Sequence, residues 1–187
     1  MDRRKALKNI GIGFGAITAT PTVVSLFQSC QTAPSFTPIS FSQEQYNVVA
    51  ELMELIIPTT DIPGAKALKL PEFADSYVDV MLDDQAKEAM LNGLNAFMEE
   101  ALIDSGKDKV SGLTLEDWDA QLAKNLKTPG LESPAAAFAA QLREMTVNAF
   151  KINEFIGEEV LAYRPIPGEQ RGCVDLMETT GGKAWSL

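Results

Sequence analysis

Apolar residues recur at three- and four-residue spacing along most of this chain, which is the period of an amphipathic helix. The first run starts at a capping box formed by Ser42 and Gln45 and stops at Pro58, so it predicts a helix between these points. Pro71 suits the first turn of a second helix. The apolar residues expected on the inward face of this second helix are Phe73, Tyr77, Val80 and Met81.

Later runs predict further helices of the same kind. One covers about 84–104, another starts at Thr114 and ends before Pro129, a third starts at Ser133, and a shorter one covers about 154–162. The inward positions expected in the three longer helices are Met90, Leu91, Leu94, Phe97, Met98, Ala101, Leu102, Trp118, Leu122, Phe138, Leu142, Met145 and Ala149.

The predicted fold class is all-α. The alternating pattern of strands does not recur, and the chain has no internal repeat. After Tyr163 the chain is rich in Pro and Gly, which predicts an extended tail. We therefore expect a single helical-bundle domain of about five to six helices with an extended C-terminal tail.

The first thirty residues have a different pattern. Arg3 and Arg4 precede a mildly apolar run at residues 10–27, which ends close to Cys30. This arrangement is typical of a twin-arginine export signal followed by a lipid-attachment cysteine. The run contains too much Gly and Thr for a spanning helix, which needs about 20 apolar residues. Ordinary cleavage nearby, or an uncleaved signal that serves as the anchor, are the alternatives.

These features divide the chain into three parts. Residues 1–29 are the expected signal, residues 30–41 the expected lipid anchor with an uncharged tether rich in Pro, Ser and Thr, and residues 42–187 the helical domain. The twin-arginine route carries proteins that fold before they cross the membrane, often around a cofactor. We therefore expect a periplasmic protein held on a membrane by its lipid.

The domain is acidic. The chain has 16 Lys and Arg against 26 Asp and Glu, a net charge of −10. Residues 1–29 hold four of the basic residues and one Asp, a net +3, so their removal takes the balance to −13. This excludes the basic footprint of a nucleic-acid-binding protein. Because anionic lipid would repel such a body, membrane attachment is expected through the acyl group alone.

The side chains available for chemistry are limited. The chain contains no histidine, so it lacks the commonest general base and the commonest metal ligand. It also lacks the Cys-x-x-Cys-His signature of covalently bound haem. Asp75, Asp79 and Asp83 are spaced by four residues, which we interpret as a solvated helix face rather than a calcium site. No residue is therefore expected to be catalytic, cofactor-binding or metal-binding.

The second cysteine of the chain, Cys173, is left unpaired if Cys30 carries lipid. In an oxidising compartment such a residue is a free thiol or one half of an intermolecular disulfide, and a buried inert thiol is the alternative. Of the two tryptophans, Trp118 is expected in the core, whereas Trp185 is freer to contact a partner.

Two stretches of the domain are the least generic, at residues 56–66 and 163–173. The first reads Ile-Ile-Pro-Thr-Thr-Asp-Ile-Pro-Gly-Ala-Lys and is followed by Pro-Glu-Phe at 71–73. Together with the signal ahead of them, these stretches resemble the gluconate 2-dehydrogenase subunit 3 family, the small subunit of membrane-bound flavin sugar dehydrogenases. The resemblance covers essentially the whole domain.

The resemblance implies a non-catalytic partner of a large glucose-methanol-choline-type oxidoreductase, which holds FAD and oxidises a sugar or polyol. In that family the small subunit typically supplies the export signal and supports maturation of the large one, while a separate cytochrome c subunit takes the electrons. The lipid-attachment cysteine departs from many members. It suggests that anchoring is done by this subunit.

The resemblance also implies where the large subunit binds. Prolines in both stretches would stiffen loops that lose little entropy on docking. The expected interface residues are Pro58, Thr59, Thr60, Asp61, Pro63, Gly64, Tyr163, Pro165, Pro167 and Gly168. A disulfide from Cys173 to the large subunit is a further hypothesis. The alternative is a stand-alone lipid-anchored binding module, in which these motifs serve only its own fold.

Overall fold

The computed structural model describes residues 36–164, 168 and 173–186. The chain divides into two compact units, Met1–Thr37 and Pro38–Leu187. Arg3, Arg4 and Cys30 belong to the first unit and lie outside the described residues, as do Pro165 and Pro167 in the second.

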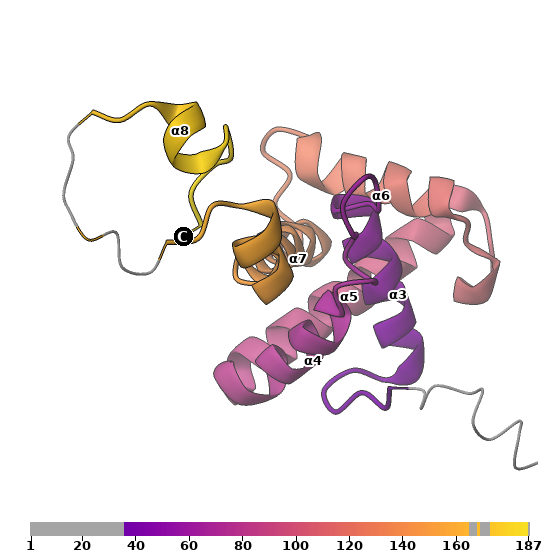
Figure 1. The fold of residues 1–187 in the computed structure, drawn as a ribbon. Coiled ribbons are helices and arrows are strands. Elements are labelled where there is room, and N and C mark those ends of the chain that lie inside the picture. The colour runs from indigo at the N-terminus through magenta and orange to yellow at the C-terminus, as the bar shows by residue number, and fades with distance from the viewer. Residues whose placement is uncertain (1–35, 165–167, 169–172, 187) are drawn as a thin grey trace, which may run out of the picture. The chain divides into compact units, whose positions relative to one another are not determined.

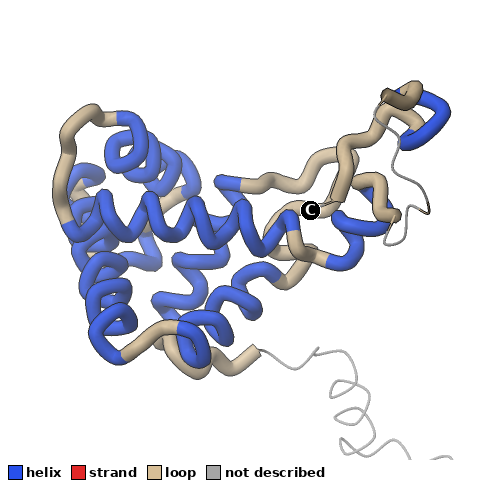
Figure 2. Tube along the Cα trace, turned by 90° about the vertical axis from the view of Figure 1, so that its left-hand side faces the viewer, coloured by secondary structure: helices blue, strands red, loops and turns tan. Residues whose placement is uncertain are grey.

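The regular elements in the described part of the unit Pro38–Leu187 are helices and helical turns, shown in Figures 1 and 2. The elements are α3 (Gln43–Ile56), α4 (Leu70–Met81), α5 (Asp84–Ser105), the 3-10 turn η1 (Val110–Gly112), α6 (Leu115–Lys127), α7 (Pro134–Lys151), the π-helical turn η2 (Ile156–Val160) and α8 (Leu176–Thr180). The predicted all-α class is confirmed.

Side-chain caps fix where these helices begin. Ser42 and Gln45 form the predicted capping box of α3, and Thr114 forms another with Asp117 at the start of α6. The Ser133 hydroxyl accepts a hydrogen bond from an early backbone N–H of α7. The caps satisfy N–H groups that have no partner within the helix. The helix starts read from the sequence are therefore confirmed to within a residue or so.

The core is formed by α3, α4, α5, α6 and α7, and aromatic contacts within it join α5, α6 and α7. Phe97 of α5 stacks on Trp118 of α6 with ring centroids 6.2 Å apart, and meets Phe138 of α7 edge-on at 5.7 Å. Gly93 lets α5 and α7 approach closely, since a Cβ there would stand 2.8 Å from both the Phe138 Cβ and the Pro134 carbonyl oxygen. All the inward positions expected for α5, α6 and α7 are buried or half-buried.

The inward face predicted for α4 is wrong. Phe73, Tyr77, Val80 and Met81 are all exposed, and the last two are 75% and 65% accessible. The residues that α4 buries instead are Leu70, Pro71, Ala74, Asp75 and Val78. The spacing of the large apolar residues is helical, but the smaller Ala74 and Val78 allow the closer approach to the bundle and so occupy the inner face.

The C-terminal tail is not wholly extended, which corrects the prediction. It contains α8, which begins at the cap residue Asp175 and ends at Gly181 in the left-handed conformation. The tail returns to the end of η2 through a short parallel bridge between Ala162 and Trp185. Across the described residues, no helix combines the length and the apolar character needed to cross a bilayer.

Candidate partner interface

The loop between α3 and α4 is held by one carboxylate, that of Glu54 in the last turn of α3. Its Oε1 accepts hydrogen bonds from the Thr59 backbone N–H at 3.0 Å and from the Thr59 hydroxyl at 2.8 Å. Its Oε2 accepts one from the Lys66 backbone N–H at 2.8 Å. The two ends of the loop are therefore joined through this side chain, in addition to the hydrogen bond from the Ala65 N–H to the Ile57 carbonyl oxygen at 3.0 Å.

Gly64 packs closely against Thr59 and the Glu54 carboxylate. Its backbone N–H donates to the Thr59 Oγ1 at 3.1 Å. A Cβ at this position would stand 2.4 Å from the Thr59 nitrogen and 2.5 Å from the Glu54 Oε1. No side chain fits there without moving the loop backbone or the carboxylate. The glycine of the sequence motif is thus required by close packing.

The charges around the loop favour an ionised Glu54. Burial alone would raise the pKa of this carboxyl, but the Lys66 N–H, the two Thr59 donors and the Lys66 ammonium outweigh it and hold the pKa below its ordinary value. Lys66 also pairs with Glu51 of α3 at 2.7 Å. The carboxylate form is the one that can accept all three hydrogen bonds.

The residues predicted for the interface in this loop differ in exposure, and Pro63 is half-buried. Pro58, Thr60 and Asp61 are exposed on its outer side. Thr59, whose backbone and hydroxyl both bind Glu54, and the buried Gly64 hold the loop in place. The loop is therefore preformed, so it presents its outer residues in one conformation.

A second carboxylate, Asp75 of α4, fixes the chain where it enters the bundle. Its Oδ2 accepts from the Ile39 N–H at 2.7 Å, and its Oδ1 accepts from the N–H groups of Ser40 and Phe41, each at 3.0 Å. Asp75 is fully buried. The interpretation of Asp75 as part of a solvated helix face is therefore wrong, because three backbone donors compensate its burial.

Tyr46 of α3 lies close to Asp75. Burial raises the pKa of Tyr46 to about 12. The charge of Glu72, a hydrogen bond to Glu72 and the charge of Asp75 act in the same direction. The phenol therefore stays protonated at neutral pH and can donate to Glu72. This links α3, α4 and the entering chain in one polar cluster.

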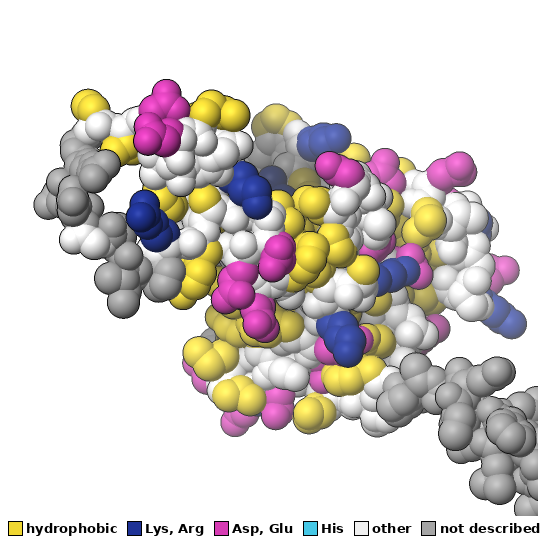
Figure 3. All heavy atoms as spheres, viewed as in Figure 1, with side chains coloured by type: hydrophobic (Ala, Val, Ile, Leu, Met, Phe, Trp, Pro, Cys, Tyr) yellow, Lys and Arg dark blue, Asp and Glu magenta, His cyan; other side chains and the backbone are white. Residues whose placement is uncertain are grey.

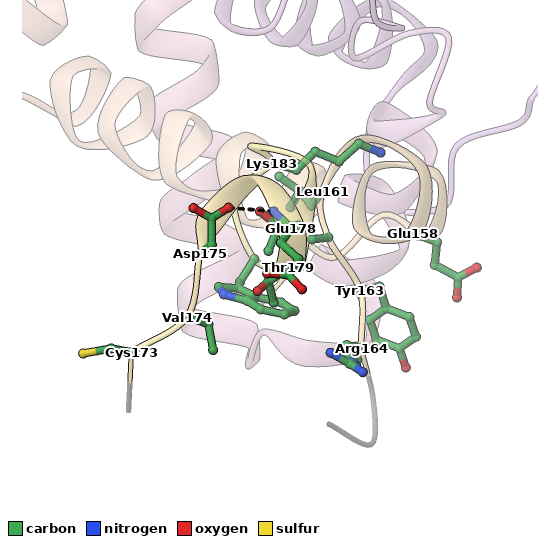
Figure 4. Close-up of a pocket in the computed structure, with 13 residues that line it drawn as sticks. Glu158, Leu161, Tyr163, Arg164, Cys173, Val174, Asp175, Glu178, Thr179 and Lys183 are labelled. Carbon is green, nitrogen blue, oxygen red and sulfur yellow. Dashed lines mark hydrogen bonds between the residues drawn. The ribbon is translucent and has the colours of Figure 1, made fainter. Parts of the chain in front are cut away.

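The second predicted stretch borders a hollow of about 800 Å³ in the C-terminal segment. Tyr163 and Arg164 lie on one side of it, and Cys173 lies at its edge with the thiol directed away from the other labelled side chains (Figure 4). The Asp175 carboxylate caps α8 through the Glu178 N–H at 2.9 Å. The hollow is predominantly polar in its lining.

The contacts that hold this segment join it to η2 and to the residues that follow η2. Lys183 donates from its Nζ to the Glu159 carbonyl oxygen at 2.6 Å, and the Ala162 bridge adds two backbone hydrogen bonds.

Cys173 is exposed and free, which contradicts the alternative of a buried thiol. Gly168 is exposed in the left-handed region, at φ 79°. Figure 1 shows this segment apart from the loop after α3, so the two predicted stretches do not form one continuous site.

Sequence reasoning missed the two carboxylates that organise the N-terminal part of the domain. Glu54 carried one signal, because an acidic residue near the C-terminus of a helix is disfavoured by the helix dipole and so suggests another partner. Asp75 carried none, since four-residue spacing also describes a solvated face. Within the described ranges, no cluster of three or more His, Cys, Asp or Glu side chains could hold a metal ion.

Comparison with known proteins gives one result. The family model described as gluconate 2-dehydrogenase subunit 3 matches residues 43–168, which covers α3 to η2 and both predicted interface stretches up to Gly168. Neither the curated proteins nor the solved structures contain a match. Because the matched region exceeds half of the chain, the protein belongs to the gluconate 2-dehydrogenase subunit 3 family, whose members are subunits of a multi-subunit dehydrogenase complex.

Proposed function

We propose that this chain is the non-catalytic accessory subunit of an FAD-dependent sugar or polyol dehydrogenase of the glucose-methanol-choline type. The observation that carries the proposal is the family match over residues 43–168. The chain acts by binding: it supports folding of the catalytic subunit, exports it and anchors it. FAD is held by that subunit, and a cytochrome c subunit is a further candidate member of the complex.

The preformed loop after α3 supports a binding role. Pro58, Thr60 and Asp61 are exposed on a loop already fixed by Glu54, so little conformational entropy would be lost when a partner covers them. Tyr163 and Arg164 are also exposed. We assign both surfaces to contact with the catalytic subunit.

Export is assigned to the paired arginines. A twin-arginine signal on this subunit would carry a large subunit that folds around FAD in the cytoplasm and has no signal of its own. Replacing Arg3 and Arg4 with Lys keeps the charge but removes the recognition pattern. The expected result is retention of both subunits in the cytoplasm on cell fractionation, whereas Lys5→Arg leaves export unchanged. Export of the double variant at the normal level would remove this part of the proposal.

Anchoring is assigned to a lipid on Cys30. Two or three acyl chains would hold the protein firmly on a membrane, since each buried methylene contributes about 0.8 kcal/mol. Cys30→Ser is expected to release the complex into the soluble periplasmic fraction, while Ser29→Ala leaves it in the membrane fraction. A Cys30→Ser complex that stays in the membrane would indicate a different anchor.

Cys173 is assigned to a disulfide with the catalytic subunit. Its thiol is exposed and has no cysteine partner among the described residues. The family match ends five residues before it, so the cross-link would be a feature of this chain's own tail. A non-reducing gel of the purified complex is expected to show one band at the summed mass, lost in Cys173→Ser. No shift in the native complex would contradict the disulfide.

The test of the whole proposal is affinity purification of the tagged chain from detergent-solubilised membranes, with mass spectrometry and an absorbance spectrum of the eluate. A yellow eluate that contains one large flavoprotein in equal amount is the expected result. A colourless protein that purifies alone would favour the alternative, a stand-alone lipid-anchored binding module.

A further inference from the structure

Helix α4 is apolar on two faces, although a surface helix is normally polar on the side away from the core. Its inner face buries Leu70, Ala74 and Val78 against the bundle. Its outer face carries Phe73, Tyr77, Val80 and Met81, between 37% and 75% exposed. By contrast, α5 and α6 each carry one exposed large apolar residue, Ile103 and Leu115. The outer face of α4 is thus a patch.

The patch continues onto α7 through a groove. The groove has a volume of about 310 Å³, and its apolar lining is Phe73, Tyr77, Leu82, Met145, Ala149 and Ile152. The rings of Phe73 and Tyr77 lie 6.1 Å apart and form one wall. A contiguous apolar surface of this kind on a domain is typical of an interaction site.

The border of the patch is strongly acidic. Residues 70–86 contain five Asp or Glu and no Lys or Arg. One of the five, Asp75, is buried and bound to backbone donors, but Asp79, Asp83 and Asp84 are exposed. Lys87 of α5 pairs with Asp79 at 3.7 Å, so this ion pair offsets part of the acidic charge at the border. The last turn of α4 has no basic residue, although the helix dipole favours one there. Hydrophobic and acidic side chains stand side by side over the α4 end of the bundle in Figure 3.

The acidic border indicates which kind of partner binds the outer face of α4. A second copy of the chain would meet the patch with the same patch in a two-fold dimer, so acidic borders would face each other. Anionic lipid would be repelled in the same way. A protein surface with an apolar centre and a border of Lys and Arg would match both features.

We propose that the outer face of α4, together with the α4–α7 groove, is a further docking surface for the catalytic subunit of the dehydrogenase complex, in addition to the loop after α3 and the exposed Tyr163 and Arg164. The inference rests on the proposed function and adds the surface through which it acts and the chemistry of the opposing side. The catalytic subunit presents apolar side chains to Phe73, Tyr77, Val80 and Met81, and Lys or Arg side chains to the acidic border.

The first test places charge in the patch without disturbing the fold. Val80 and Met81 are mostly exposed, so Val80→Asp with Met81→Asp is expected to leave the melting temperature nearly unchanged. Capture of the catalytic subunit by the tagged full chain is expected to fall at least about tenfold, as for central interface residues. The matched control, Ile103→Asp with Leu115→Asp, changes equally exposed apolar residues on α5 and α6 and keeps full capture.

The second test addresses the charge of the opposing surface. Asp79→Lys reverses one border charge and is expected to weaken capture several-fold at low salt, with the difference shrinking at high salt as the charges are screened. Asp119→Lys, an exposed aspartate of α6, is the control and is expected to leave capture at both salt concentrations unchanged. An equal effect of the two substitutions would overturn the assignment of a basic partner surface.

The outcomes separate this inference from the proposed function. If the wild-type chain captures no flavoprotein, the proposed function fails. If the wild type captures it and Val80→Asp with Met81→Asp captures it equally well, the docking surface lies elsewhere. If the purified wild-type chain is a dimer that the same double variant disperses, the patch binds a second copy and the inference is wrong.

Discussion

The connections at the two ends of this domain are held in contrasting ways. In the N-terminal part, the entering chain at 39–41 and the loop at 57–66 each bind a carboxylate of a neighbouring helix, Asp75 or Glu54, through several donors. The C-terminal tail is held by one short bridge and by Lys183 on a carbonyl. No residue of α8 is buried.

The comparison indicates that side-chain contacts, rather than prolines alone, make the loop after α3 stiff. The prolines of the loop after α3 suggested rigidity, but proline alone fixes only its own φ. Here Glu54 joins both ends of the loop, and Gly64 lets them approach. The tail is also rich in Pro and Gly, but among its described residues no carboxylate accepts hydrogen bonds from two separate parts of the chain. We therefore expect substitutions in the N-terminal connections to cost stability and those in the tail to cost very little.

The largest effect is expected for Asp75→Ala. Three backbone N–H groups near the core would lose their acceptor, which should lower the free energy of unfolding by about 3 kcal/mol or more. Urea denaturation measures this. Asp79→Ala, one turn further along α4 and exposed, is the control and should change the value by at most about 0.5 kcal/mol. Equal small losses in the two variants would mean that Asp75 does not hold residues 39–41 in place.

Gly64→Ala is expected to have the next largest effect. The added methyl group would collide with the Thr59 nitrogen and the Glu54 carboxylate, and overpacking of this kind costs about 2 kcal/mol. The same substitution at Gly112, where a Cβ meets nothing within 4 Å, is the control. Thermal or urea melts of the two variants give the comparison. A Gly64→Ala protein as stable as Gly112→Ala would contradict the close packing.

Glu54→Gln should cost about 1 kcal/mol, because the hydrogen bonds to the Thr59 and Lys66 N–H groups lose their ionic acceptor. The folded-state pKa of Glu54 lies below its ordinary value of 4.5. Its contribution is therefore complete above the pKa of the unfolded chain and disappears as the pH falls through the folded-state pKa. Stability measured from pH 6 downward should fall less steeply in Glu54→Gln. Parallel curves would show that Glu54 has no such role.

The smallest effect is expected in the tail. Trp185 is 48% exposed, and the two hydrogen bonds of its bridge with Ala162 are made by the backbone of Ala184 and Ser186. Trp185→Ala should therefore change the free energy of unfolding by no more than about 0.5 kcal/mol. Trp118→Ala, at the stacked core tryptophan, should cost about 3 kcal/mol or more. A large loss at Trp185 would show that the tail is an integral part of the bundle.

Much of the fold could be predicted from the chain because its local signals agree with its packing. The caps at Ser42, Thr114 and Ser133 set the starts of three helices, and helical spacing found the core around Phe97. The prediction failed at α4, where large apolar residues face outward. Periodicity detects an apolar face but cannot tell the core from a surface kept apolar for another chain.

The candidate interface was harder to predict for a related reason. The motif at 56–66 was found, but the role of Glu54 depends on donors five and twelve residues away, and that of Asp75 on donors more than thirty residues away. Such contacts have no fixed spacing in the sequence. Asp75 and Asp79 look equivalent in the chain, although one is fully buried and the other exposed.

The most direct test of the central claim is native mass spectrometry of the complex purified from membranes through a tag on this chain, with a flavin absorbance spectrum of the same sample. We expect one copy of this chain bound to one large flavoprotein. This species should be lost in Val80→Asp with Met81→Asp but not in Ile103→Asp with Leu115→Asp. A wild-type chain found alone, without flavin, would contradict the claim.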